Sequence, residues 1–265
     1  HLVDVLVENQ HDVRIYDRSH EHFREPKPQV EYILGDINDS VKLFESMMDI
    51  DAVFHLVSST VPSSSSLDLK NDIEKNIYPT ISILESVAKL GVKKIVFFSS
   101  GGAVYGNTDN LPISEGHGLY PISSYGLSKI MIEKYIHLYA NLHSFKSLII
   151  RPSNPYGPRQ GHYKAQGVIS TFLRKAQKNE AFEIFGDGEN LKDYIYVDDL
   201  IKFVIGLFEQ NKEGIYNAGS GEGASINQLV EIIDKVTGKK NKVHHIDPKD
   251  YDIKNFILDV SKVKK

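Results

Sequence analysis

Tyr125 and Lys129 stand four residues apart in the stretch Ser123–Lys129, which follows the segment Ser99–Gly106. A tyrosine and a lysine at this spacing lie on one face of a helix. An ammonium group in that position can lower the pKa of the phenol, normally about 10, so that the phenol exchanges a proton with a substrate hydroxyl. The spacing therefore suggests acid–base chemistry, although a surface tyrosine beside a solvated lysine has the same pattern.

The elements that must position this pair follow from the hydrophobic pattern. An apolar strand is expected at 94–98, and its end presents the hydroxyls of Ser99 and Ser100, which could hold a substrate in place. Further strands are expected at 13–17, 30–34, 52–56 and 145–150, and helices at 1–9, 40–48, 68–90 and 124–142. Strands that alternate with helices predict an α/β fold with a parallel sheet and helices on both faces. Pro79, inside the helix expected at 68–90, is expected to kink or break it.

Composition narrows the classes of function. The chain has 265 residues, 41% hydrophobic and 25% charged, as is usual for a globular protein in solution. A net charge of −4 provides no basic surface for nucleic acid, and the absence of a long apolar run gives no membrane partner. Without cysteine there is no disulfide, thiolate catalysis or Cys-type zinc site, and the histidines form no His-Glu-x-x-His pattern, so no metal is expected. We expect a cytoplasmic protein.

Asp17 ends the strand expected at 13–17. An acidic residue at the end of the second strand of a βαβ unit usually binds the ribose hydroxyls of a dinucleotide. Asp17 has that place if residues 1–9 form the first helix, and a turn-forming aspartate is the alternative. Because that helix has no start signal before it, the first strand and the glycine-rich loop of such a domain are expected to precede His1.

The segment Arg151–Arg159 contains many turn-forming residues and indicates that the chain leaves the sheet there. We therefore expect a Rossmann-type doubly wound domain at 1–152 that binds a dinucleotide, and a smaller C-terminal substrate lobe at 153–265. Part of the segment around 193–217 is expected to return to the Rossmann sheet. Helices are expected at 168–177, 197–209 and 226–236, with strands at 182–185, 215–217 and 243–246. The crevice between two such lobes is the default ligand site.

The segments Ser99–Gly106, Tyr125–Lys129 and Arg151–Arg159 resemble the extended short-chain dehydrogenase/reductase family, and most closely its nucleotide-sugar 4-epimerases of the UDP-glucose 4-epimerase type. The resemblance implies that Tyr125 is the catalytic base and acid, with Lys129 as its partner. The cofactor contacts that it implies are Asp17, Asp36, Ile37, Leu56, Asn76, Ser99 and Pro152, besides Tyr125 and Lys129. The substrate contacts that it implies are Ser100, Asn154, Arg159, Lys192, Lys249 and Phe256. A homodimer is also expected.

Several positions depart from the family's pattern. The serine or threonine usual before the Val-Tyr-Gly segment is replaced by Gly101 and Gly102, so Ser100 is the first choice for the catalytic hydroxyl and Ser99 the second. Two arginines that clamp the diphosphate in many relatives correspond to Lys192 and Lys249. Lysine keeps the charge but loses the bidentate geometry. The family's C-terminal helices, which follow the strand at 256–259 in relatives, are expected to lie beyond residue 265.

The resemblance also narrows the reaction. Dehydratases of the family need an added acid just before the Val-Tyr segment, where this chain has Ala103, and its C3/C5 epimerases commonly use a cysteine. What remains is 4-epimerisation of a nucleotide-sugar, with NAD preferred over NADP because Asp17 would repel a 2′-phosphate. Phe256 would limit space near the sugar's C2 substituent and favour UDP-glucose over its N-acetyl counterpart; ordinary core packing is the alternative for it. A reductase or dehydrogenase with exchangeable cofactor and a non-catalytic dinucleotide sensor stay open as alternatives.

Overall fold

The computed structural model describes residues 1–60, 65–160, 167–248 and 253–263. The chain divides into two compact units. The first unit comprises His1–Ser100, Ser123–Arg151 and Ile201–Tyr216, and the second comprises Gly101–Ile122, Pro152–Leu200 and Asn217–Lys265. Each unit is described separately below.

Parallel strands form the centre of the first unit. Strands β1 (Val13–Asp17) and β2 (Val30–Leu34) pair in parallel, with Val13 opposite Val30. A four-stranded sheet has the order β3-β4-β5-β9, in which β3 pairs with β4 in parallel and β4 pairs with β5 in parallel. Its strands are Ala52–His55, Lys94–Phe98, Lys146–Pro152 and Gly214–Ala218. The carboxyl ends of β3, β4 and β5 therefore lie along one edge, where ligands of parallel sheets usually bind.

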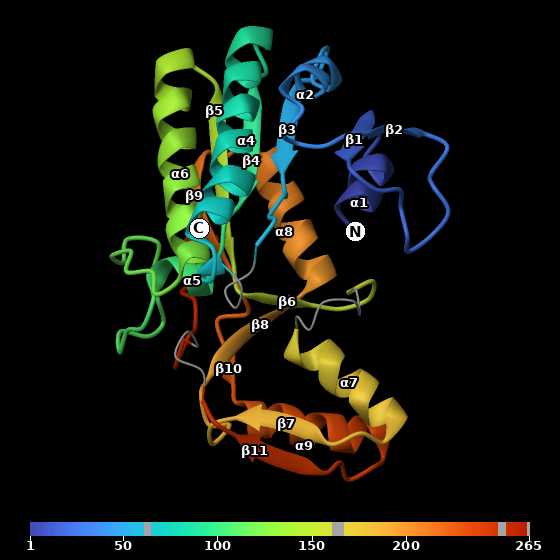
Figure 1. The fold of residues 1–265 in the computed structure, drawn as a ribbon, viewed down its shortest axis with the longest axis vertical. Helices are drawn as coiled ribbons and strands as arrows, with labels where there is room; N and C mark the ends of the chain where they lie inside the picture. The colour runs from blue at the N-terminus through green and yellow to red at the C-terminus, as the bar shows by residue number, and fades with distance from the viewer. Residues whose placement is uncertain (61–64, 161–166, 249–252, 264–265) are drawn as a thin grey trace. The chain divides into compact units, whose positions relative to one another are not determined.

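Helices cover both faces of this sheet. Side chains of a strand alternate between the two faces, so Ile95 and Phe97 join the core formed with α4 (Leu69–Leu90) and α6 (Ser124–His143). Lys94 points to the other face, where its Nζ donates to the Phe208 carbonyl oxygen of α8 (Val197–Glu209) at 3.3 Å. Figure 1 shows α4 and α6 side by side on one face. The shorter helices α1 (Leu2–Glu8) and α2 (Ser40–Ser46) complete the unit.

Pro79 was predicted to kink or break this helix; α4 is continuous through it, so there is no break. Proline has no amide hydrogen and leaves the carbonyl oxygen four residues earlier without its helical donor. Here that oxygen belongs to Lys75, and it accepts a hydrogen bond from Ser59 Oγ at 3.3 Å. The helix begins after the cap Asp68, which accepts from the Asn71 amide, and ends at Gly91 with φ +68°.

The second unit is built from short elements around a core of its own. Its sheets have the orders β10-β8-β6 and β11-β7, with Phe172, Phe182 and Ile233 in the core beneath α7 and α9. The strands are β6 (Asn154–Tyr156), β7 (Phe182–Phe185), β8 (Lys192–Tyr196), β10 (Gly223–Ala224) and β11 (Val243–Ile246). The helices are α5 (Gly101–Tyr105), α7 (Val168–Lys178), α9 (Ile226–Thr237) and a 3₁₀ turn at Ser261–Val263. Among these, α5, β6, β8 and β10 were not predicted.

Candidate active site

Tyr125 and Lys129 lie on α6 in the first unit, as the spacing predicted. Helix α6 begins after Ser123, whose side chain accepts a hydrogen bond from the Gly126 amide and caps the helix. Tyr125 is therefore held in the first turn. Lys129 is 4% exposed, and its Nζ donates to the Phe98 carbonyl oxygen at 3.0 Å. The same Nζ lies 5.6 Å from the centre of the Tyr125 ring.

Two serine hydroxyls hydrogen-bond with the Tyr125 side chain: Ser100, just after β4, and Ser58, after β3. These hydrogen bonds lower the pKa of the phenol, but burial and the charge of Asp72 raise it, and burial is the largest effect. The pKa of Tyr125 is therefore raised above its usual value. The expectation that Lys129 would lower it was wrong, because loss of hydration around the phenol outweighs the favourable contacts.

Burial lowers the pKa of Lys129 to about 8, against the opposing effects of the carboxylates Glu133 and Asp72. His55, at the end of β3, is fully enclosed, and burial followed by the charge of Lys129 lowers its pKa to about 3. Its Nε2 lies 3.0 Å from Thr80 Oγ1, which itself donates to the Asn76 carbonyl oxygen at 2.6 Å. The hydroxyl oxygen is thus the acceptor, and the neutral imidazole carries its proton on Nε2.

Glu133 and Arg151 form a buried ion pair close to Lys129 along α6. Glu133 lies one helical turn after Lys129, and it accepts from Arg151 Nε at 3.0 Å and Nη2 at 2.6 Å. Ser99 Oγ donates to the same carboxylate at 2.5 Å. Both charged side chains are 2% exposed. The pair therefore joins α6 to the ends of β4 and β5. The hydroxyl of Ser99 is engaged in the hydrogen bond to Glu133, whereas the hydroxyl of Ser100 contacts Tyr125.

A second network of polar groups lies at the start of α4. Asn76 Oδ1 accepts from the Ser59 amide at 2.9 Å, and its Nδ2 donates to Thr60 Oγ1 at 3.1 Å. Asn76 was predicted as a cofactor contact, and in the structure its amide holds the loop 58–60 that carries Ser58. The carboxylate of Asp72 is completely buried beside it.

The side chains at the carboxyl ends of β1, β2 and β3 fit a dinucleotide. Asp17 is exposed at the end of β1, and its Oδ1 accepts from the Ser19 amide at 2.9 Å. Asp36 is exposed after β2, and hydrogen bonds from the Asn38 amide and side chain lower its pKa. Leu34 at the end of β2 and Leu56 just after β3 expose apolar surface, at 38% and 48%. Carboxylates for ribose hydroxyls next to apolar surface for planar rings are what such a ligand requires. Ile37, the remaining predicted contact in this segment, is half-buried.

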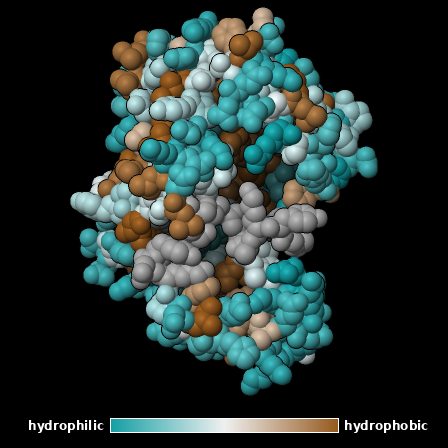
Figure 2. All heavy atoms as spheres, in the orientation of Figure 1, coloured by the Kyte–Doolittle hydropathy of each residue, from teal (hydrophilic) through white to brown (hydrophobic). Residues whose placement is uncertain are grey.

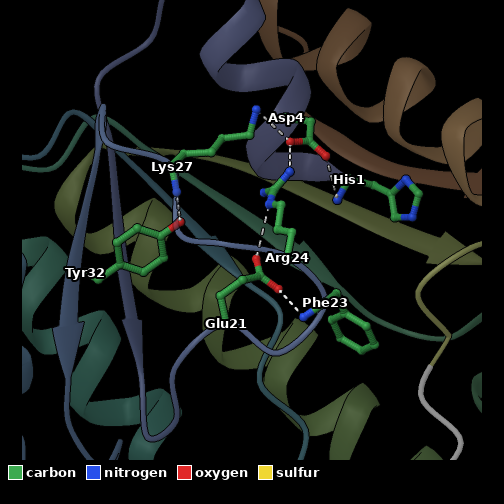
Figure 3. A network of polar contacts seen from close by, with 7 residues as sticks. All are labelled: His1, Asp4, Glu21, Phe23, Arg24, Lys27 and Tyr32. Carbon is green, nitrogen blue, oxygen red and sulfur yellow. Dashed lines mark hydrogen bonds and ion pairs between the residues drawn. The ribbon is translucent and has the colours of Figure 1, made fainter.

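The segment that follows Asp17 is held by its own polar network (Figure 3). Asp4 of α1 pairs with Arg24, and Lys27 Nζ lies 3.0 Å from the same carboxylate oxygen. The Lys27 amide donates to the Tyr32 hydroxyl of β2 at 3.1 Å. These contacts attach the β1–β2 connection to α1 and thereby define the surroundings of Asp17.

The predicted substrate residues other than Ser100 fall in the second unit, as does Pro152. Asn154 is exposed on β6, and its Nδ2 donates to the Asp193 carbonyl oxygen at 2.8 Å. Arg159 is exposed, with φ +62°, and Lys192 Nζ donates to the Ile253 carbonyl oxygen. Lys249 lies outside the described residues.

Phe256 is 2% exposed and packs against the two glycines that replace the family's serine or threonine. A Cβ atom at Gly101 would lie 3.0 Å from the Phe256 ring and 2.9 Å from the Pro152 carbonyl oxygen. At Gly102 the ring would be 3.8 Å away, which is an ordinary contact. The chain therefore has glycine at position 101 because Phe256 and the backbone fill the space of a side chain.

Five contributors to the first unit's site were not predicted: His55, Ser58, Asp72, Glu133 and Arg151. Only Glu133 had a sequence signal, because Tyr125, Lys129 and Glu133 recur at intervals of four on one helical face. The other four are brought to the site by tertiary packing.

Among the described residues, no group of three or more His, Cys, Asp or Glu side chains could hold a metal ion. No described helix is long and apolar enough to span a bilayer.

A parallel α/β unit that presents tyrosine, lysine and serine at the carboxyl ends of its strands has the architecture of a dinucleotide-dependent oxidoreductase-type enzyme. The family model described as "NAD dependent epimerase/dehydratase family" matches residues 1–219. The chain belongs to this family, as the sequence predicted, and the family's cofactor is NAD.

Relatives and solved structures agree with this assignment. A protein of Methanocaldococcus jannaschii provisionally named UDP-glucose 4-epimerase is 36% identical over the whole chain and 87% of its own length. A dTDP-4-dehydro-6-deoxyglucose reductase of Escherichia coli is 37% identical over 82% of the chain and 69% of its own length. The crystal structure of UDP-glucose 4-epimerase with UDP-glucose from Thermotoga maritima has a TM-score of 0.93 at 33% identity, covering 100% of this chain and 87% of that one. The prediction of a Rossmann-type fold is thereby confirmed.

Proposed function

We propose that the protein catalyses NAD-dependent 4-epimerisation of a nucleotide-sugar of the UDP-glucose/UDP-galactose type. The main support for this proposal is the surroundings of Tyr125. Its side chain hydrogen-bonds with Ser100 and Ser58, and the Lys129 ammonium lies 5.6 Å from the centre of the Tyr125 ring. This group can accept and return a proton at one substrate hydroxyl. NAD, when bound, supplies the acceptor and donor of hydride.

In this proposal Tyr125 takes the proton from the C4 hydroxyl oxygen and later returns it. Ser100 orients that oxygen through the hydrogen bond it shares with the phenol. Lys129, with a pKa of about 8, is mostly protonated at pH 7, so its positive charge stabilises the phenolate as it forms. The raised pKa of Tyr125 favours the return of the proton, because the phenol is the more stable form before and after each turnover.

The remaining roles belong to the same proposal. Residues 1–152 form the NAD-binding domain, with Asp17, Asp36, Ile37, Leu56, Asn76, Ser99, Tyr125, Lys129 and Pro152 as cofactor contacts. The lobe at 153–265, apart from the part that returns to the sheet, contributes Asn154, Arg159, Lys192, Lys249 and Phe256 to the substrate. The exposed carboxylate of Asp17 favours NAD over NADP because it repels a 2′-phosphate. The Phe256 ring, packed against Gly101 and Gly102, favours UDP-glucose over its N-acetyl counterpart.

A nucleotide-sugar reductase is the second candidate. The observation that favours it is the reductase of Escherichia coli, which is 37% identical over 82% of the chain. In this alternative, Tyr125, Lys129 and NAD would have the same roles as in the epimerase. They differ in whether the reduced cofactor stays bound and returns its hydride to the same sugar.

We also propose a cytoplasmic homodimer. Helices α4 and α6 pack side by side and carry exposed apolar side chains at Leu69, Ile73, Tyr78, Leu127, Leu138 and Leu142. Hydrophobic side chains interrupt the hydrophilic surface on the face that carries these helices (Figure 2). A two-fold axis would bring the same helices of two copies together and cover these side chains.

Replacement of Tyr125 tests the proposed function. We expect Tyr125→Phe to lower kcat for the conversion of UDP-galactose to UDP-glucose at least about 100-fold, since the phenol is the proposed acid and base. The stability should change little, because the substitution removes one hydroxyl and leaves the packing of the ring in place. Tyr135→Phe, on the same helix, is the matched control and should keep activity. Turnover of Tyr125→Phe within a few-fold of the wild-type rate would refute the assignment.

A further inference from the structure

The carboxylate of Asp72 is a buried charged group of the first unit that the proposed mechanism does not use. Asp72 lies in the first turn of α4 and is 0% exposed. Four uncharged side chains donate to it: Thr60, Asn76 (3.0 Å), Ser124 (2.7 Å) and Ser128 (2.6 Å). These hydroxyls and this amide satisfy the acceptor oxygens of the buried carboxylate, and none of the four donors carries a charge that could neutralise it.

The four donors come from three separate segments. Thr60 belongs to the loop after β3, two residues beyond Ser58, whose hydroxyl contacts Tyr125. Asn76 belongs to α4, and Ser124 and Ser128 flank Tyr125 on α6. Asp72 is consequently the point at which the loop, α4 and the first turn of the catalytic helix are joined.

The position of Asp72 also gives its charge a direct effect on the two central side chains. The negative charge raises the pKa of both Tyr125 and Lys129. The other titratable or charged groups that face this pair are His55 from β3 and Glu133 from α6, the latter paired with Arg151 of β5.

We propose that Asp72 is a positioning residue: by joining the loop after β3, α4 and the first turns of α6, it fixes Tyr125 against Ser58 and Ser100, and its buried negative charge acts on the Tyr125–Lys129 pair. This inference rests on the proposed function for its catalytic meaning. The effects of Asp72 on the position and the titration of Tyr125 can be measured without substrate.

The test is a titration of Tyr125 by ¹³C NMR of ζ-labelled tyrosine, with Tyr125→Phe to assign the signal. We expect Asp72→Asn to lower the pKa of Tyr125 by about one unit, because a nearby negative charge that opposed ionisation is removed. The acid limb of the kcat–pH profile should move to lower pH in the same variant. Asp68→Asn is the matched control, because Asp68 caps the same helix from an exposed position and asparagine is an equally good cap.

An Asp72→Asn protein that is folded by circular dichroism but titrates as Asp68→Asn does would overturn the electrostatic part of the proposal.

If Asp72→Asn does not fold, Ser124→Ala tests the positioning part, since it removes one donor and keeps the charge. We expect kcat to fall roughly tenfold with unchanged NAD binding and a melting temperature within a few degrees of wild type. Ser82→Ala, a serine of α4 outside the network, should have no such effect. Equal kcat values for Ser124→Ala and Ser82→Ala would overturn the positioning role. Because the tyrosine titration needs no substrate, its outcome is separate from whether the enzyme is an epimerase.

Discussion

His55 and Lys129 are two basic side chains buried in one site, and both have pKa values lowered by burial. Only Lys129 retains a charge at neutral pH, because Glu133 and Asp72 partly compensate for its loss of hydration. His55 has no such compensation and is neutral, with a hydrogen bond to Thr80. Of these two side chains, only Lys129 therefore places a positive charge near the Tyr125 ring.

The neutral state of His55 predicts how stability depends on pH. The folded protein does not protonate His55 until about pH 3, whereas the unfolded chain does so near 6.5. The unfolded state thus binds more protons below pH 6.5, and stability is lost as the pH falls from there toward 3. For this one group the loss between pH 7 and pH 5 is about 2 kcal/mol.

The measurement is urea unfolding of wild type and His55→Gln at pH 7 and pH 5. Glutamine keeps a donor for Thr80 but does not titrate, so its free energy of unfolding should fall by about 2 kcal/mol less than that of wild type over this range. His143→Gln, at an exposed position at the end of α6, is the control. Parallel pH dependences for wild type and His55→Gln would show that His55 is not buried in the neutral form.

At the scale of elements, the start of α6 decides where Tyr125 points. Ser123 caps this helix by accepting from the Gly126 amide at 3.2 Å. We expect Ser123→Ala to lower the free energy of unfolding by about 1 kcal/mol, the usual contribution of an N-cap, and to lower kcat several-fold because the first turn frays. Ser123→Asn supplies another good cap and should restore both. A drop in stability with unchanged kcat would show that the cap does not position Tyr125.

The long elements were predictable because their hydrophobic periodicity is set locally. The boundaries of β2, β4, β7, β11 and α8 match those expected. The strand β6 was missed because Pro155 argued against a strand, and the structure accommodates the proline at the sheet edge, where one side of the strand needs no amide donor. Helix α5 was missed because it begins with two glycines, and those are required by the packing of Phe256 rather than by helix propensity.

At the scale of the whole molecule, the family and cofactor could be predicted from ordered motifs, and the chemistry of the site could be predicted only in part. The Tyr125–Lys129 spacing defines a helix face, so their proximity follows from the sequence. The pKa of Tyr125 does not, since it depends on burial and on Asp72, which lies 53 positions earlier in the sequence. Ser58 and Arg151 likewise reach the site only through strand pairing and packing.

The central claim is that the protein oxidises and re-reduces the same sugar at C4 without releasing its cofactor. The most direct measurement follows UDP-glucose carrying deuterium at C4 through turnover in the presence of free NAD. The account predicts that UDP-galactose forms with the deuterium still at C4 and that no reduced cofactor accumulates in solution. Loss of the deuterium to free cofactor, or net formation of NADH in proportion to substrate consumed, would contradict epimerisation and identify the enzyme as a dehydrogenase or reductase.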